Sequence, residues 1–369
     1  MQQPRIIISG GGTGGHIFPA ISIANALKRL NPKAEILFVG AANRMEMQRV
    51  PQAGYEIVGL PVRGLIRPLW SPRNIGILWD YVKSKRRVKK ILKNFAPDVA
   101  VGVGGYASAA TLNAAYDLGI PCLIQEQNSF AGLTNKTLAT KASRICVAYE
   151  GMERFFPADR IMLTGNPVRQ NLQATSMSKE EAAKEFGFKA DRPIILLIGG
   201  SLGARTLNNS VLKSLEQIRN AGVRIIWQTG GYYKGHIAQE MERLGKPSNL
   251  YVTDFIQSMD KAYRAADLVI SRAGASSISE LCLLGKPSIL VPSPNVAEDH
   301  QTHNAMALVD KGAALIVKDA EAEDKLIPLA LATATDAETL RNLGKNALAM
   351  AMQDSDTIIA EEVLKLIRK

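Results

Sequence analysis

The stretch that decides the fold is RIIISGGGTGGHIFPA (5–20), a short apolar run followed by a glycine-rich turn and a helical pattern. Gly10, Gly12 and Gly15 fit the spacing G-x-G-x-x-G directly after a predicted strand. Glycines allow positive φ angles, and a helix N-terminus offers unpaired N–H groups to an anion. A second strand, glycine turn and helix, IGGSLGARTLN (198–208), opens the other half of the chain. Two such turns in equivalent positions indicate two related halves that share one ligand site.

Short apolar runs alternate with helix-length amphipathic stretches on both sides of these turns. Strands that alternate with helices predict parallel sheets covered by helices on both faces. The fold class is therefore α/β, with two Rossmann-like, doubly wound parallel-sheet domains that face each other across a cleft. The runs expected to form strands are residues 5–9, 35–40, 98–104, 120–125 and 143–148, and then 193–200, 223–230, 249–255, 266–274 and 286–292.

The domain boundary is expected in GNPVRQN (165–171), because glycine and Asn-Pro favour a turn. This divides the chain into an N-terminal domain (1–164) and a C-terminal domain (165–354). The last helix, residues 355–369, is expected to pack back on the first domain. A length of 369 residues agrees with two domains.

The composition is that of a globular protein, with 46% hydrophobic and 21% charged residues. Cys122, Cys146 and Cys282 lie far apart in apolar patterns, which favours reduced, buried thiols in a reducing compartment. The N-terminus does not read as a secretory signal, and no apolar run approaches the roughly 20 residues of a membrane-spanning helix. These features predict a soluble protein.

The positive charge is concentrated in the first half of the chain. Residues 1–165 carry 21 Lys+Arg and 10 Asp+Glu, whereas residues 166–369 carry 24 of each. Such a surface favours a polyanionic partner, either nucleic acid or an anionic membrane, and its simpler alternative is a well-solvated surface. No nucleic-acid-binding module is visible, and the basic run has stacking aromatics only near Trp70 and Trp79, so no nucleic acid partner is expected.

The stretch DLVISRAGASSISELCLLGKPSILVPSPNVAEDHQTHNA (267–305) is the most informative about chemistry. Its small and hydroxyl residues at 273–277 precede a predicted helix and suit a diphosphate. Glu280 follows, and a carboxylate there can accept hydrogen bonds from both hydroxyls of a ribose. The alternative for Glu280 is a capping box, because Ser277-x-x-Glu280 matches that pattern.

Two other classes of chemistry lack support. A dinucleotide site for hydride transfer needs an acid at the end of the second strand, but that strand runs into GAAN (40–43) and Glu35 is at its start. Asp354-Ser355-Asp356 matches the D-x-D of metal-dependent sugar transferases, yet Ser355 or Asp356 is explained more simply as the N-cap of the last helix. We therefore expect neither a nicotinamide cofactor nor a metal.

These motifs resemble the MurG family, in order and over nearly the whole chain. MurG enzymes have the GT-B fold and move N-acetylglucosamine from UDP-GlcNAc onto lipid I (undecaprenyl-pyrophosphoryl-MurNAc-pentapeptide). The transfer inverts the anomeric centre and gives the β-1,4 link of lipid II for peptidoglycan synthesis. The resemblance implies this function, without a cofactor. The motifs are GGTGGHIFPA (11–20), VGVGGYAS (101–108), QEQNSFAGLTNK (125–136), TGNPVR (164–169), GGSLGAR (199–205) and RAGASSISE…GKPSILVP…EDHQTHNA (272–305).

The resemblance also implies which residues bind the two substrates. The acceptor would contact Gly14, Gly15, Tyr106, Asn128 and Asn135. Some members have two adjacent glutamines where this chain has His300-Gln301, which leaves the role of His300 open. The donor UDP-GlcNAc would contact Thr13, Gly14, Gly15, Asn128, Arg169, Ser201, Ile256, Ala275, Ser276, Ser277, Glu280 and Gln301.

The acceptor hydroxyl must lose a proton as it attacks, and two residues are candidate catalytic bases. His16 follows the first glycine turn, and an imidazole titrates near neutrality. The alternative for His16 is a structural role at the start of the helix. Glu126 is the other candidate, because it lies in QEQNS at the end of a predicted strand.

Residues 60–95 suggest a contact with a membrane. An apolar loop precedes a helical pattern, and seven cations then fall within residues 83–93. The alternative is a core-facing helix with a solvated basic side. Tryptophans among cations fit an interfacial anchor, and a lipid-linked acceptor gives such an anchor a purpose. We expect peripheral docking to the anionic inner leaflet, at the cytoplasmic face of the cell membrane, through Leu69, Trp70, Ile75, Leu78, Trp79, Lys83 and Arg86.

The nearest alternative function is that of another GT-B enzyme, such as a lipid glucosyltransferase or a UDP-GlcNAc 2-epimerase. The 125–136 segment and the first glycine turn favour the MurG family over both.

Overall fold

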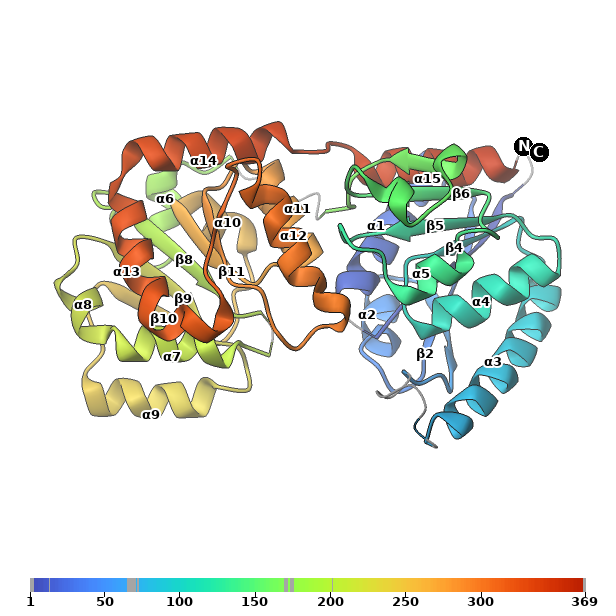
Figure 1. Cartoon of the computed structure of the whole chain (residues 1–369), viewed down its shortest axis with the longest axis horizontal. Coiled ribbons are helices and arrows are strands. Elements are labelled where there is room, and N and C mark those ends of the chain that lie inside the picture. Colours follow the sequence, from blue (N-terminus) through green and yellow to red (C-terminus); the bar gives the residue numbers. More distant parts are fainter. Residues whose placement is uncertain are drawn as a thin grey trace. The chain divides into compact units, whose positions relative to one another are not determined.

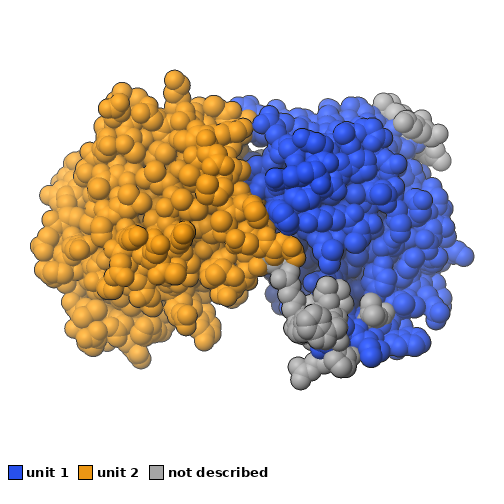
Figure 2. Space-filling view, viewed as in Figure 1, with its two compact units in different colours: residues 1–168, 352–369 blue, residues 169–351 orange. Residues whose placement is uncertain are grey.

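The computed structural model describes residues 3–12, 14–64, 71, 73–168, 172, 176–200 and 202–367. The chain divides into two compact units, which Figure 2 colours separately. Unit 1 comprises residues 1–168 together with 352–369, and unit 2 comprises residues 169–351. The chain thus first passes from unit 1 to unit 2 after residue 168, a few residues beyond the boundary expected after residue 164.

Unit 1 contains a seven-stranded parallel sheet with the order β3-β2-β1-β4-β5-β6-β7 (Figure 1). The order reverses between β1 and β4, so the loops after these strands flank a topological switch point. The strands are β1 (Arg5–Ser9), β2 (Glu35–Ala41), β3 (Glu56–Leu60), β4 (Val99–Gly102), β5 (Cys122–Glu126), β6 (Arg144–Val147) and β7 (Ile161–Leu163). The α-helices are α1 (Gly14–Leu30), α2 (Glu46–Gln52), α3 (Arg73–Phe95), α4 (Tyr106–Asp117), α5 (Leu133–Leu138) and α15 (Ser355–Ile367).

Unit 2 repeats this plan with a six-stranded parallel sheet in the order β10-β9-β8-β11-β12-β13, whose switch point lies between β8 and β11. The strands are β8 (Ile194–Ile198), β9 (Arg224–Gln228), β10 (Leu250–Thr253), β11 (Leu268–Ser271), β12 (Ser288–Leu290) and β13 (Leu315–Ile316). The α-helices are α6 (Lys179–Lys184), α7 (Arg205–Lys213), α8 (Leu215–Asn220), α9 (Lys234–Leu244), α10 (Met259–Ala265), α11 (Ala275–Leu283), α12 (His300–Val309), α13 (Ala322–Thr335) and α14 (Ala337–Ala349).

The apolar runs form strands because both faces of each sheet are covered. In β1, Ile6 and Ile8 enter one apolar layer and Ile7 enters the layer on the opposite face. Ile194 and Ile195 of β8 divide in the same way between two layers. Burying such a side chain contributes about 1.5–3 kcal/mol, which explains why these strands are continuously apolar rather than alternating. All three cysteines are buried, and burial raises the pKa of each thiol to about 12.

The C-terminal helix α15 packs along α1 in unit 1 (Figure 1). Ile359 and Val363 are fully buried there, in the apolar layer that also contains Ile6. The helix already includes Ser355 and Asp356, so the prediction that one of them is its N-cap is wrong. Asp356 Oδ2 instead accepts a hydrogen bond from Arg29 Nη2 of α1 at 2.9 Å, which ties the last helix to the first.

Candidate active site

The glycine turns after β1 and β4 meet at the switch point of unit 1. A Cβ atom at Gly105 would lie 2.6 Å from the carbonyl oxygen of Gly11, and one at Gly10 would lie 2.1 Å from Val103 Cγ2. Gly105 also has a φ of +85°, which L side chains rarely adopt. Glycine is therefore required here because the two backbones touch.

His16 lies in the first turn of α1, beside both glycine turns. Its Nδ1 is 3.1 Å from the carbonyl oxygen of Gly11, and a Cβ atom at Gly104 would lie 2.8 Å from its Nε2. A carbonyl oxygen only accepts hydrogen bonds, so Nδ1 carries the hydrogen and Nε2 has the lone pair in the neutral ring. That tautomer is the one in which His16 can receive a proton at Nε2.

Glu126, at the end of β5, is 2% exposed and accepts hydrogen bonds at both carboxylate oxygens. Its Oε1 accepts from the backbone N–H of Asn128 at 3.1 Å and from Asn128 Nδ2 at 3.2 Å. Its Oε2 accepts from the N–H of Gly132 at 3.0 Å and from Asn135 Nδ2 at 2.9 Å. The carboxylate thus organises the loop between β5 and α5, an arrangement that favours His16 over Glu126 as the base.

The other residues of unit 1 that were predicted to contact the acceptor follow strands at the carboxyl edge of its sheet. Tyr106 begins α4 directly after Gly105, and its ring is exposed and covers Gly64. Asn135 is buried, and its Oδ1 has no hydrogen-bond partner among the described residues. Gly14 and Gly15 form the start of α1.

In unit 2, helix α11 begins at the switch point with the small residues singled out in the sequence. Gly274 is its N-cap, so Ala275, Ser276 and Ser277 form the first turn. A capping box would place its acid three residues after the N-cap, and Glu280 is six residues after Gly274. The capping-box alternative for Ser277 and Glu280 is therefore wrong. The first turn presents backbone N–H groups and hydroxyls at the positive end of a helix.

Glu280 points into a buried position, where it is only 4% exposed. Its Oε2 accepts a hydrogen bond from the hydroxyl of Tyr263 at 3.0 Å. Tyr263 is on α10, so the contact fixes the carboxylate from a neighbouring helix. Ile256, another predicted donor contact, is buried in the loop after β10.

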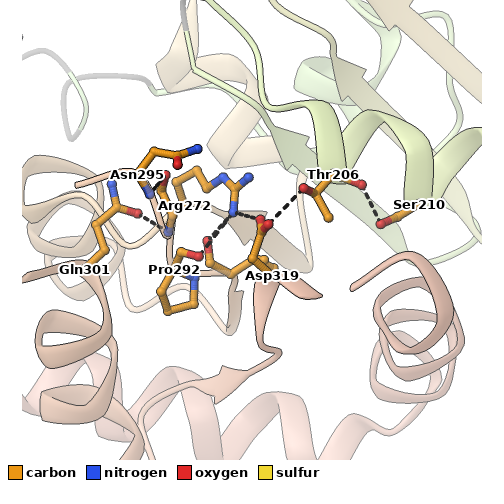
Figure 3. A network of polar contacts seen from close by, with 9 residues as sticks. Thr206, Ser210, Arg272, Pro292, Asn295, Gln301 and Asp319 are labelled. Atoms are coloured by element: carbon orange, nitrogen blue, oxygen red, sulfur yellow. Dashed lines mark hydrogen bonds and ion pairs between the residues drawn. The ribbon is translucent and has the colours of Figure 1, made fainter. Parts of the chain in front are cut away.

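Arg272, directly after β11, was not predicted from the sequence. Its Nη1 donates to the carbonyl oxygens of Val291 and Pro292, at 3.1 and 3.3 Å, and pairs with Asp319 (Figure 3). Asp319 Oδ2 accepts from Thr206 Oγ1 at 3.0 Å. This network ties the ends of β11 and β12 to the start of α7, and so holds the loops at the carboxyl edge of the sheet.

The loop before α12 is strained next to Gln301. Glu298 and Asp299 have φ angles of +54° and +48°, a left-handed conformation that aspartate sometimes adopts but that is unfavourable for glutamate. Gln301 Oε1 accepts a hydrogen bond from the N–H of Ser293 at 2.9 Å (Figure 3). The sharp turn at these two residues leads into the first turn of α12, which contains His300 and Gln301. The hydrogen bond of Gln301 holds this turn against the loop after β12.

Helix α3 has an apolar exposed stripe. Ile75 and Trp79 are each 62% exposed and Val82 is 40% exposed, whereas Ile77, Val88 and Leu92 form the buried side. The alternative that the apolar residues of this helix face the core is therefore wrong for Ile75, Trp79 and Val82. Among the described residues, no helix is long and apolar enough to cross a membrane.

The cations of α3 divide into two groups. Lys85 and Lys89 lie 2.9 and 2.7 Å from Asp117 of α4, and Lys89 and Lys85 together lower the pKa of Asp117 to about 2. The other five continue the exposed side of the helix: Lys83, Arg86, Arg87, Lys90 and Lys93.

Some predicted site residues lie outside the described part of the chain. They are Thr13, Arg169, Ser201, Leu69 and Trp70, and the side chain of Leu78 is also not described. Within the described ranges, no three His, Cys, Asp or Glu side chains are grouped so that they could hold a metal ion.

Comparison with known families defines the class of protein. Residues 6–147 match the glycosyltransferase family 28 N-terminal domain, and residues 194–359 match the glycosyltransferase family 28 C-terminal domain. The chain thus has both domains of a family 28 glycosyltransferase.

The chain is also similar to individual proteins along its whole length. It is 59% identical over 367 residues to the UDP-N-acetylglucosamine–N-acetylmuramyl-(pentapeptide) pyrophosphoryl-undecaprenol N-acetylglucosamine transferase of Bacteroides fragilis, covering 99% of this chain and 96% of the relative. The crystal structure of Acinetobacter baumannii MurG has a TM-score of 0.79 at 28% identity, covering 98% and 99% of the two chains. The chain therefore belongs to the MurG family.

A UDP-N-acetylglucosamine 2-epimerase of Listeria monocytogenes shares only the fold. Its crystal structure has a TM-score of 0.70 at 14% sequence identity, covering 100% of this chain and 96% of the other. Fold alone therefore does not separate a transferase from an epimerase, and the sequence match to the MurG family does.

Proposed function

We propose that this chain transfers N-acetylglucosamine from UDP-GlcNAc to the C4 hydroxyl of the muramyl sugar of lipid I, giving lipid II for peptidoglycan synthesis. The observation that carries the proposal is the full-length match, at 59% identity, to a transferase whose name states this donor and acceptor. In this proposal the acceptor binds at the carboxyl edge of the sheet in unit 1, and the UDP part of the donor binds at the carboxyl edge of the sheet in unit 2.

The donor is bound by unit 2 through the start of α11 and Glu280. The N–H groups and hydroxyls of Ala275, Ser276 and Ser277 bind the diphosphate, and the helix dipole stabilises its charge as UDP leaves. The Glu280 carboxylate accepts hydrogen bonds from the ribose hydroxyls, and the hydroxyl of Tyr263 fixes its orientation. The side-chain oxygen of Gln301 holds the loop after β12, which lies at the carboxyl edge of this sheet.

The acceptor is activated by unit 1. The C4 oxygen attacks the anomeric carbon on the face opposite the diphosphate, and its proton moves to Nε2 of His16 as the bond between that carbon and the phosphate oxygen breaks. Glu126 holds Asn128 and Asn135 in place to position the sugars, and Tyr106 begins α4 with an exposed ring. Attack on the opposite face inverts the anomeric centre.

Proton NMR of the disaccharide product tests this stereochemistry. We expect the H1–H2 coupling of the new glycosidic bond to be that of a β linkage, because one displacement inverts the α linkage of UDP-GlcNAc. A product with an α linkage would contradict direct attack by the acceptor.

We also propose that the exposed side of α3 docks peripherally on the anionic inner leaflet of the cell membrane. Ile75, Trp79 and Val82 provide the apolar part, and the adjoining exposed cations, including Lys83 and Arg86, provide electrostatic attraction. Each cation near the surface contributes about 1 kcal/mol. Docking would bring the enzyme to a lipid-linked acceptor while the donor arrives from solution.

Sedimentation with lipid vesicles tests the docking. We expect binding to anionic vesicles that falls as salt is added, and that falls further in Ile75→Ser and Trp79→Ser. Tyr232→Ser is the matched control, since Tyr232 is also strongly exposed but lies in unit 2. Equal sedimentation of all four proteins, or binding that is insensitive to salt and lipid charge, would refute the proposal.

A further inference from the structure

A buried carboxylate lies under the first glycine turn. Glu46, in the first turn of α2, is 1% exposed. Its Oε1 accepts hydrogen bonds from the N–H of Gly12 at 3.1 Å and from the N–H of Ala41 at 3.0 Å, and its Oε2 also lies 3.2 Å from the N of Gly12. The carboxylate therefore joins the end of β2 to the turn that follows β1.

The backbone is shaped to admit this side chain. A Cβ atom at Gly11 would lie 2.0 Å from Glu46 Oε1, and one at Gly40 would lie 2.7 Å from Glu46 Cγ. Gly12 has a φ of +89°. The glycines of the turn thus make room for a carboxylate of the protein itself, and the N–H of Gly12 already donates a hydrogen bond to that carboxylate. This differs from the expectation that the turn offers its N–H groups to an anion.

The same peptide group also holds His16. The N–H bound by Glu46 belongs to Gly12, and the carbonyl oxygen that accepts from His16 Nδ1 belongs to Gly11. These two atoms are the opposite ends of one planar amide, and in a trans peptide they point in opposite directions. Glu46 and His16 are therefore linked through a single peptide group, with the carboxylate on one side and the imidazole on the other.

A carboxylate that binds the N–H of an amide polarises its carbonyl oxygen and makes it a stronger acceptor. The stronger acceptor favours the hydrogen on Nδ1 of His16 and leaves the lone pair on Nε2. It also stabilises the imidazolium that forms when Nε2 receives a proton.

We propose that Glu46 is a positioning residue that sets the tautomer and basicity of His16 through the Gly11–Gly12 peptide group. The inference rests on the proposed role of His16 as the catalytic base. It goes further, because it assigns a purpose to a buried acid that does not touch substrate. It also makes the first glycine turn unfavourable for a phosphate, since an anion there would face the Glu46 carboxylate.

Glu46→Gln tests the linkage, because an amide of the same size removes the charge, and its NH2 group would take the place of Oε2 and face the N–H of Gly12. Glu56→Gln is the matched control, since Glu56 is an exposed acid in the same unit. We expect Glu46→Gln to lower kcat by about 10- to 100-fold, by analogy with the hydrogen-bond partners that orient metal-bound histidines. We expect the KM for UDP-GlcNAc to stay within about twofold, because the proposal assigns the UDP part of the donor to unit 2 and Glu46 to the backbone of unit 1. The control should match the wild type in both.

The ¹⁵N NMR signals of the histidine side chains give a readout that a purely structural role would leave unchanged. The chain has 4 histidines, and His16→Ala identifies the signals of His16. In the wild type we expect the hydrogen on Nδ1. In Glu46→Gln we expect a mixture of tautomers, a lower pKa of His16, and an acidic limb of the kcat/KM profile displaced in the same direction.

The outcomes separate this inference from the role of His16 itself. Wild-type kcat in His16→Ala would refute His16 as the base, and the NMR spectra would still show whether Glu46 controls its tautomer. If Glu46→Gln does not fold, Glu46→Asp, which keeps the charge but shortens the reach, is expected to shift the tautomer in the same direction by less. A folded Glu46 variant with an unchanged His16 tautomer and pH profile would overturn the proposal, whatever its kcat.

Discussion

Replacing His16 with alanine is expected to lower kcat by about 10²- to 10⁴-fold, the range that a well-placed general base contributes. The side chain is only partly buried, so the melting temperature should change little. The KM for UDP-GlcNAc should also change little, because the proposal assigns the binding of the UDP part of the donor to unit 2 and not to His16. The measurement is steady-state kinetics across a range of pH. The rise of activity near neutrality should disappear in the variant.

Glu126→Gln gives the contrast that identifies the base. This carboxylate is buried and accepts four hydrogen bonds from the loop and the helix α5 that follow it, so the variant should lower thermal stability together with activity. Its remaining activity should keep the wild-type pH dependence. The opposite pattern, with wild-type kcat in His16→Ala and a lost pH limb in Glu126→Gln, would make Glu126 the base.

Glu280→Ala is expected to raise the KM for UDP-GlcNAc by about 10- to 150-fold. A hydrogen bond to a charged group contributes about 1.5–3 kcal/mol, and the ribose would lose this partner. Isothermal titration with UDP alone should show a matching loss of affinity, because the contact does not involve the transferred sugar.

Two variants control for indirect effects at this position. Tyr263→Phe keeps the carboxylate but removes the hydrogen bond that orients it, so a smaller rise in KM is expected. Glu338→Ala removes an exposed acid at the start of α14 and should behave as the wild type. An unchanged KM in Glu280→Ala would remove the ribose contact from the proposed site.

The strands that the sequence predicted share one physical feature. Each of the ten predicted runs overlaps a strand of the structure, because buried parallel strands are continuously apolar. The three strands that were missed are β3, β7 and β13, and all of them are at sheet edges. Their residues are mostly half-buried or exposed, so they lack the long apolar run that identifies a strand.

The candidate site was predictable only where its signal is local. The glycine turns, the start of α11 and the position of Glu126 at a strand end follow from short patterns. Arg272 and Asp319 are 47 residues apart, and Glu46 reaches Gly12 across 34 residues. Such contacts depend on which strands become neighbours in the sheet, and spacing within the sequence does not report that. The capping-box alternative for Glu280 failed for a related reason, because the helix begins earlier than its serine pattern suggested.

Sugar transfer itself is measured by incubating the full chain with radiolabelled UDP-GlcNAc and a lipid I analogue, and then extracting the lipid product. We predict that label enters the lipid fraction only when the analogue is present, with one UDP released for each sugar transferred. The analogue without its muramyl sugar should accept nothing, because the attacking C4 hydroxyl is then absent. Conversion of UDP-GlcNAc to its 2-epimer without transfer, or transfer to a lipid that carries no muramyl sugar, would contradict the proposed function.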